Sequence, residues 1–234
     1  MKRYFSLYTA IGVIGLAAIL IGFSKTFIIP VSNFSFQAPV IIYIHGFFAF
    51  SWVVLFVFQA YLIKAEKWST HMTIGVLGVL IAVGVAVTIP FAGAYQVQKD
   101  TAQGGGDSAV SAITGTITAA LMFITLVFAG LHYRKKPEVH KRLMLLATIT
   151  VLWPAWFRFR HFFPSVPNPE IWFALVLADS LIIVAWIWDK LKNGRIHPTL
   201  LYVGSFVIAE QTIEALTYDS EPWRAVARYL YAVF

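Results

Sequence analysis

The sequence predicts an all-α fold, a bundle of seven transmembrane helices that forms a single domain over residues 1–234. Of these 234 residues, 59% are hydrophobic and only 12% are charged, and the mean hydropathy is +0.74. Charged residues make up about 25% of an ordinary soluble domain, so the chain is far too apolar for that class. Its apolar residues also fall into separate runs, each about as long as the 20 residues that a helix needs to cross a bilayer.

Seven such runs can be placed along the chain. We expect transmembrane helices at residues 5–24, 39–63, 70–94, 109–132, 138–161, 170–191 and 198–218, and an interfacial helix at residues 221–234. The first run is long for the apolar part of a secretory signal and no small-residue cleavage pattern follows it, which favours a retained helix. Pro90 is expected to kink the third helix. Trp223 and Tyr229 give the last segment aromatic residues that favour a membrane interface.

The fifth segment, from Pro137 to Phe163, is the one around which the rest of the chain is expected to be arranged. It reads PEVHKRLMLLATITVLWPAWFRFRHFF, with basic residues near both ends and an apolar run between them. Pro137 suits the first position of a helix, and Pro154 is expected to kink that helix. His140 and Arg158 are 18 residues apart, about five turns, so a continuous helix would place them on one face near opposite membrane surfaces.

Short loops between the apolar runs hold most of the basic residues. With the N-terminus in the cytoplasm, 12 of the 18 Lys and Arg residues lie on the cytoplasmic side and 6 on the other side. The cytoplasmic set is Lys2, Arg3, Lys64, Lys67, Arg134, Lys135, Lys136, Lys141, Arg142, Lys190, Lys192 and Arg195. Such an excess predicts a multi-pass protein of the inner (plasma) membrane with a cytoplasmic N-terminus and an extracytoplasmic C-terminus. The basic charge is therefore expected to face the lipid bilayer and not nucleic acid.

The chain contains no cysteine, which excludes several kinds of chemistry. Disulfides, thiolate nucleophiles, iron–sulfur clusters and zinc sites with cysteine ligands all require that residue. A transition metal or haem would have to be held by histidines or carboxylates instead.

Ionisable residues in the outer halves of the predicted spans form the first candidate site. An ionisable side chain inside a membrane is costly and usually faces the bundle interior, an ionic partner or a water-filled cavity. These residues could form a proton path, a metal site or a pocket for a charged substrate, or Arg158 could simply neutralise an acid and lock two helices together. Asp179 has no basic residue nearby in its own helix, so we expect it to pair with Arg158. The outer-half cavity would contain His45, Arg158, His161, Asp179, Glu210, Gln211 and Glu214.

Histidines near the inner surface form the second candidate site. Imidazole is a good ligand for zinc, copper and iron, including haem iron, although histidines at helix ends often only face headgroups and water. The inner-face cluster would contain Gln59, His71, His132, His140, Arg142 and His197. We expect His45, His71 and His140 to be the metal ligands, with His45 and His71 in different surroundings and not on one ion. No catalytic residue can be assigned.

Several stretches resemble a widespread family of uncharacterised bacterial seven-helix membrane proteins. They are YIHGFFAFSWVVLFVFQ, THMTIG, PEVHKRLMLLATI and GRIHP. The resemblance covers nearly the whole chain. This resemblance implies the fold and the membrane location, and it implies no reaction. More remotely, histidines spread over the second to fifth helices resemble those of cytochrome b561-type electron carriers, which implies haem. Those proteins place paired histidines inside helices, whereas only His45 lies clearly within a span here.

Three functions are consistent with these features. The first is a redox-type membrane protein that binds haem or a metal ion through histidines. The second is a transport or binding protein, proton-coupled or specific for a small molecule such as a quinone, that uses the outer-half cavity. The third is a membrane assembly factor without catalysis. The absorption spectrum of the purified protein would separate the first function from the other two.

Overall fold

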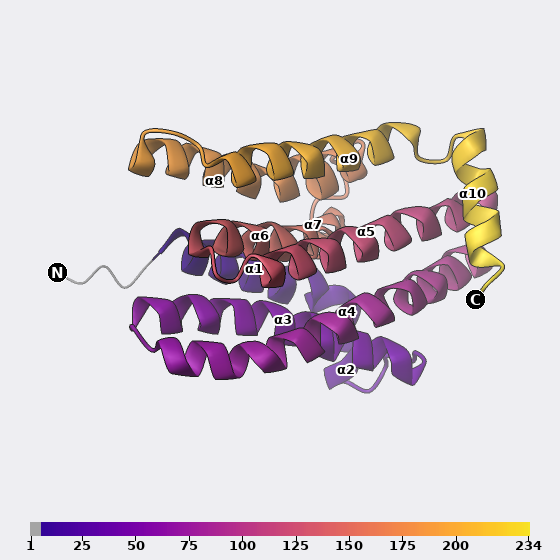
Figure 1. The fold of residues 1–234 in the computed structure, drawn as a ribbon. Helices are drawn as coiled ribbons and strands as arrows, with labels where there is room; N and C mark the ends of the chain where they lie inside the picture. Colours follow the sequence, from indigo (N-terminus) through magenta and orange to yellow (C-terminus); the bar gives the residue numbers. More distant parts are fainter. Residues whose placement is uncertain (1–5) are drawn as a thin grey trace.

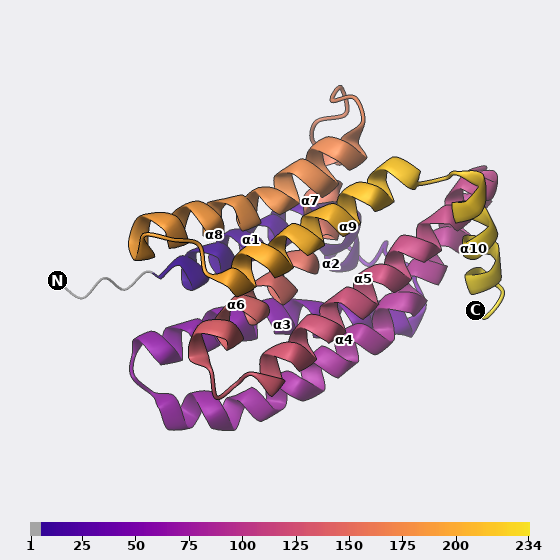
Figure 2. The same ribbon diagram turned by 45° about the horizontal axis from the view of Figure 1, so that its top comes forward.

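The computed structural model describes residues 6–234, which form helices joined by short connections and contain no β-strand. Most helices run along one long axis, and α10 lies across one end of the bundle (Figures 1 and 2). The α-helices are α1 (Leu7–Phe23), α2 (Ile29–Ser32), α3 (Val40–Lys64), α4 (Trp68–Ala102), α5 (Gly106–His132), α6 (Pro137–Thr150), α7 (Trp153–Phe157), α8 (Ala178–Asn193), α9 (Gly204–Thr217) and α10 (Glu221–Tyr231).

Two ends of the bundle can be distinguished in Figure 1. The connections α3–α4, α5–α6 and α8–α9 lie at one end, and α2 and α10 lie at the other. We call the first the Arg142 end, because Arg142 lies in the second turn of α6. We call the other the Lys25 end, because Lys25 follows α1 there.

The protein has the helices of a multi-pass membrane protein. Five helical stretches are long and apolar enough to cross a bilayer, namely Leu7–Ser32, Val40–Lys64, Trp68–Ala102, Gly106–His132 and Glu170–Asn193. Large apolar side chains cover the outside of these helices, and Phe47, Val76 and Leu80 are each about two-thirds exposed. An apolar outer surface of this kind suits a lipid environment and not water.

The fifth predicted span is not one helix, which corrects an expectation from the sequence. α6 ends at Thr150, α7 begins at Trp153, and a 3-10 turn follows at Arg158–His161. Pro154 accounts for the break, because proline has no backbone N–H and its ring would clash with the carbonyl of Thr150, four residues earlier. His140 and Arg158 therefore do not share a helix face.

α6 lies at the centre of the bundle. Leu145, Leu146 and Ala147 are fully buried, and α1, α3, α5 and α8 all contact this helix. α1 also approaches α7 very closely. A Cβ atom added to Gly22 would lie 2.2 Å from the backbone oxygen of Ala155, so this crossing requires glycine.

α4 is longer than the predicted span 70–94 and continues through Pro90 to Ala102. Its 35 residues extend for about 52 Å, well beyond the roughly 30 Å of hydrocarbon in a bilayer. The last turns of α4 and the first turns of α5 project together at the Lys25 end, where α10 covers them (Figure 1). Ala227 of α10 packs against Val97 and Ile113, so the predicted C-terminal helix is present and uses these two helices as its support.

Candidate functional site

Polar residues inside the bundle form three separate groups and do not merge into the two sites expected from the sequence. A salt-bridge network and a histidine pair lie toward the Arg142 end. Three acids of α8 and α9 form the third group, in which Glu210 acts electrostatically on the other two. We call this group the acid cluster: Asp179, Glu210 and Glu214.

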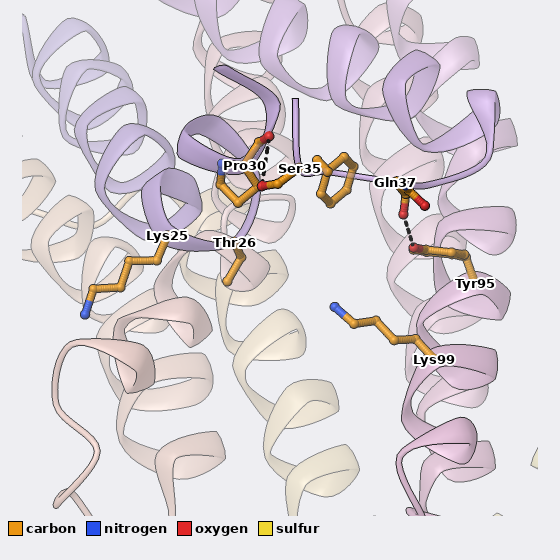
Figure 3. Close-up of a pocket in the computed structure, with 8 residues that line it drawn as sticks. Lys25, Thr26, Pro30, Ser35, Gln37, Tyr95 and Lys99 are labelled. Carbon is orange, nitrogen blue, oxygen red and sulfur yellow. Dashed lines mark hydrogen bonds between the residues drawn. The ribbon is translucent and has the colours of Figure 1, made fainter. Parts of the chain in front are cut away.

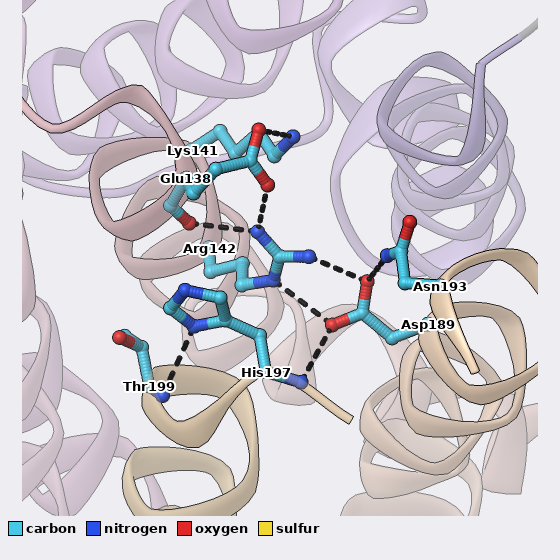
Figure 4. A network of polar contacts seen from close by, with 7 residues as sticks. All are labelled: Glu138, Lys141, Arg142, Asp189, Asn193, His197 and Thr199. Carbon is cyan, nitrogen blue, oxygen red and sulfur yellow. Dashed lines mark hydrogen bonds and ion pairs between the residues drawn. The ribbon is translucent and has the colours of Figure 1, made fainter. Parts of the chain in front are cut away.

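The salt-bridge network is centred on Arg142, whose side chain is only 2% exposed (Figure 4). Its Nη2 and Nε atoms donate to the two carboxylate oxygens of Asp189 over 2.5 and 3.0 Å. Its Nη1 atom donates to a carboxylate oxygen and to the backbone oxygen of Glu138 over 2.6 and 2.8 Å. A guanidinium bound on both sides by carboxylates is electrostatically satisfied, so Arg142 is not available to bind an anionic substrate.

Asp189 also holds the turn between α8 and the segment leading to α9. It accepts hydrogen bonds from Asn193 Nδ2 over 2.8 Å and from the backbone N–H of His197 over 3.0 Å. Gly194 makes that turn possible, because its φ of 72° is left-handed. The network thus joins α6, α8 and the following turn, and His197 contributes to it as backbone and not as a metal ligand.

Asp189 and Glu138 are essential to this network, yet the sequence offered only an indirect sign of them. Arg142 falls on an inward-facing position of an apolar helix and needs a carboxylate partner. Glu138 and Asp189 themselves lie near helix ends, close to Lys141 and Lys190, where charged residues are ordinarily exposed at the surface.

The histidine pair consists of His71 in α4 and His140 in α6, whose ring centroids are 6.5 Å apart. The Nδ1 atom of His140 lies 2.8 Å from the backbone oxygen of Gly130, so Nδ1 is the donor of this hydrogen bond. Gln59 donates through Nε2 to the backbone oxygen of His71 over 3.3 Å. The Nδ1 atom of His71 and the Oε1 atom of Gln59 are buried without a hydrogen-bond partner.

The metal set expected from the sequence is not assembled, which is a second correction. His45 is bonded through Nδ1 to Thr88 Oγ1 over 3.0 Å, apart from the histidine pair. Within residues 6–234, no group of three or more His, Asp or Glu side chains could hold a metal ion. Two imidazoles are fewer than the three protein ligands typical of a metal site, and haem binding stays a prediction from the sequence. His132 packs against the ring of Tyr133, with centroids 4.9 Å apart.

Arg158 does not pair with Asp179, which is a third correction. Its guanidinium lies 4.0 Å from the ring centroid of Phe23 and donates to the backbone oxygen of Pro154 over 2.8 Å. The break after α6 places Arg158 on the 3-10 turn beside α1, so its side chain packs on that helix and does not reach the carboxylate of α8. His161, on the same turn, accepts a hydrogen bond from Lys25 through its backbone oxygen over 2.9 Å.

The acid cluster therefore has no cationic partner among the residues that the structure describes. Asp179 is 5% exposed, and both of its carboxyl oxygens are buried without a hydrogen-bond partner. Glu210 lies within electrostatic range of Asp179. Gln211, next to Glu210 on α9, is only half-buried.

Glu214 is held against α5 by two features of that helix. Its Oε2 atom accepts a hydrogen bond from Thr118 Oγ1 over 3.1 Å. A Cβ atom added to Gly115 would lie only 1.8 Å from Glu214 Oε1, so the carboxyl occupies the space that a side chain would fill. α5 is thus shaped to receive this carboxyl group.

A line of hydroxyl groups leads along α5 from the acid cluster toward the Lys25 end. Ser111, Thr114 and Thr118 are three to four residues apart, which places them on one helix face. Ser111 and Thr114 are buried, and the Thr114 hydroxyl has no hydrogen-bond partner. At the Lys25 end, Ser111 donates to Asp219 over 2.9 Å.

Asp219 lies outside the helices, between α9 and α10, where the line of hydroxyls ends. Arg224 donates two hydrogen bonds to its carboxylate over 2.8 and 2.7 Å. This contact lowers the pKa of Asp219 to about 2, so the group is a carboxylate at neutral pH. The line of hydroxyls thus ends at a surface carboxylate that is ion-paired with Arg224.

Two π-helical segments adjoin the helices that carry the acids. One, Glu170–Leu177, ends just before Asp179, and the other, Thr199–Val203, leads into α9. π-helical turns are rare, and many of those known lie at functional sites. A third π-helical segment, Ser24–Ile28, follows α1 and does not adjoin these acids.

Comparison of the chain with protein-family models, with curated proteins and with solved structures gave no match.

Proposed function

We propose that this protein binds protons within the membrane through the acid cluster and exchanges them with the aqueous phase, as in proton-coupled transport. The observation that carries this proposal is Asp179, a buried carboxyl group in an apolar helix with neither a cation nor a hydrogen-bond donor beside it. Carboxyl groups inside membrane helices mark proton relays and ion pathways, because a purely structural role would not offset the free energy that their burial in the membrane costs.

Electrostatics favours protonated carboxyl groups in the cluster. A carboxylate buried without a partner is strongly disfavoured, and neighbouring carboxylates disfavour one another's ionisation further. Asp179 and Glu210 are such neighbours, and Glu214 has only the Thr118 hydroxyl. A proton can leave the cluster only when another proton or a cation replaces it, which is the coupling that a proton-linked transporter needs.

The hydroxyl line of α5 supplies a route for these protons. Hydroxyl groups both donate and accept hydrogen bonds, so they can pass a proton between a surface carboxylate and a buried one. Ser111 contacts Asp219 at the surface, and Thr118 contacts Glu214 in the cluster. Thr114 lies between them with its hydroxyl unpaired.

Replacement of Asp179 by Asn should abolish proton exchange while leaving a folded protein. The amide has nearly the same size as the carboxyl group but cannot carry a proton. In vesicles with an entrapped pH-sensitive dye, a potassium diffusion potential should drive proton uptake with the native protein. With Asp179→Asn the rate should fall to that of protein-free vesicles. The infrared band of a buried carboxylic acid should weaken in the same variant.

Asp107→Asn is the matched control, because it makes the same chemical change at a carboxylate whose side chain is 67% exposed. It should leave both the proton uptake and the infrared band unchanged. Native rates in vesicles that contain Asp179→Asn would refute the proposal, as would an unchanged carboxylic acid band.

We further propose that the chain crosses the membrane seven times, with the N-terminus in the cytoplasm. The helices of residues 137–161 and 199–217 would complete the five long apolar stretches, and the excess of basic residues at the Arg142 end supports this orientation. Because the chain has no cysteine, single cysteines introduced as Lys136→Cys and Phe234→Cys can be labelled selectively. An impermeant thiol reagent added to sealed cells should modify only the second. Labelling of both positions from one side would contradict seven crossings.

A further inference from the structure

A cleft at the Lys25 end is independent of the acid cluster. Its volume is about 560 Å³, and it lies between the last turns of α4 and the segment that follows α1 (Figure 3). That volume is within the range of about 300–1,000 Å³ that is usual for small-molecule sites. The cleft is lined by Lys25, Thr26, Pro30, Ser35, Phe36, Gln37, Tyr95 and Lys99.

The groups that line the cleft suit an anion that accepts hydrogen bonds. Lys99 extends from α4 toward Thr26, whose hydroxyl is buried and has no hydrogen-bond partner (Figure 3). Tyr95 donates to the backbone oxygen of Gln37 over 3.2 Å and so fixes one wall to the other. Lys25 adds positive charge, although its ammonium group is held by the backbone oxygen of His161.

Further basic groups lie in the same region of the protein as Lys25 and Lys99. Arg158 and Arg160, on the 3-10 turn, act on His161 together with Lys25 and Lys99, which places all of these cations in one region. Asp100 is the acid next to Lys99, and it already accepts a hydrogen bond from Gln96 over 2.7 Å. The region therefore has four cations against the single carboxylate of Asp100, which leaves an excess of positive charge.

Exposed apolar side chains lie next to the cleft and form its apolar rim. Phe34 is 94% exposed and Ile29 is 53% exposed, both on the segment that forms one wall. The 17 residues of α1 extend for about 26 Å, so Lys25 lies nearly one hydrocarbon thickness away from the start of that helix. If the hydrocarbon layer begins at the start of α1, its opposite boundary, where headgroups meet acyl chains, falls close to the cleft.

We propose that this cleft binds the phosphate group of an anionic phospholipid, with Lys99 as its main ionic contact and the Thr26 hydroxyl as a donor. The acyl chains would lie against the exposed apolar residues of the rim. A phosphate group is also present as a free ion in solution, but a free ion would make no use of the apolar rim. Basic pockets at membrane surfaces that bind lipid phosphates follow the same physical rule.

Thermal unfolding in detergent tests this proposal with two sources of phosphate. Phosphatidylglycerol should raise the midpoint temperature of unfolding of the native protein, and this rise should saturate with lipid concentration. Phosphatidylcholine and inorganic phosphate should not raise the midpoint temperature. Lys99→Gln should weaken the apparent affinity for phosphatidylglycerol about tenfold, since it removes one charge-assisted contact. Lys64→Gln, which removes the same charge from an exposed position at the other end of the bundle, should have no effect.

Three results would overturn the proposal. Equal protection of the native protein and of Lys99→Gln would show that the cleft is not the binding site. Equal losses of affinity for phosphatidylglycerol in Lys99→Gln and Lys64→Gln would show that the lipid responds to the overall positive charge of the protein and not to the cleft. Protection by inorganic phosphate alone would identify a site for a free anion and not for a lipid. Proton exchange by the acid cluster is not involved in any of these measurements.

Discussion

Replacement of Asp189 by Asn should lower the free energy of unfolding by about 3–5 kcal/mol, the usual cost of removing one partner of a buried ion pair. Asp189 accepts four hydrogen bonds through its carboxylate, two of them from Arg142, and its side chain is only 6% exposed. The amide keeps the shape but cannot balance the guanidinium charge. It also turns two donor hydrogens toward groups that are themselves donors. Equilibrium unfolding in mixed micelles would measure the loss.

The double variant Arg142→Met/Asp189→Leu should be less destabilised than the sum of the single changes, because it leaves no lone buried charge. Glu138→Gln is the control. Glu138 also bonds Arg142, but its side chain is 60% exposed, so its replacement should cost about 1 kcal/mol or less. Equal losses for Asp189→Asn and Glu138→Gln would show that burial does not strengthen this network.

Replacement of Gly22 by Ala should cost about 3 kcal/mol, near the upper limit for overpacking a well-packed core. The new methyl group would lie 2.2 Å from the backbone oxygen of Ala155 and 3.1 Å from its carbonyl carbon. A side chain could rotate away, but this contact is with backbone, so α1 and α7 must move apart. The same unfolding measurement applies.

Gly46→Ala is the control for this prediction, because it adds the same methyl group to the interior of α3. Its nearest neighbour would be the Phe27 ring at 3.7 Å, an ordinary contact. Alanine also favours the helix over glycine by up to about 1 kcal/mol, so Gly46→Ala should be neutral or stabilising. Native-like stability of Gly22→Ala would mean that α1 and α7 do not cross as closely as described.

The extent of several helices could be predicted from the sequence alone. The expected span 39–63 differs by one residue at each end from α3, Val40–Lys64, and the expected start of the fifth span at residue 138 is one residue from α6. Continuous hydropathy, followed by charged residues, marks α3, and Pro137 marks the start of α6. These signals are local, so no knowledge of neighbouring helices is needed.

Two prolines show that local sequence signals do not fully determine where a helix ends. Pro90 lies inside α4, which continues to Ala102, whereas α6 ends four residues before Pro154. Both prolines weaken a helix in the same way, and the neighbouring helices determine whether it continues. α4 packs along α5, and beyond Pro90 its Val97 also lies in an apolar cluster with Ala227 of α10. The segment after Thr150 turns to pack against α1.

The membrane class, the helical fold and the presence of ionisable groups inside the spans were determined by the sequence itself, because each depends on composition and local order. Which charges meet was decided only by the tertiary structure. Arg142 pairs with Asp189, 47 residues away, whereas Arg158 packs on Phe23 and leaves Asp179 without a partner. A buried charge pairs with an opposite charge that lies within a few ångströms of it. Which charges come that close depends on where helices cross and where they break, and the sequence of a single segment does not determine this.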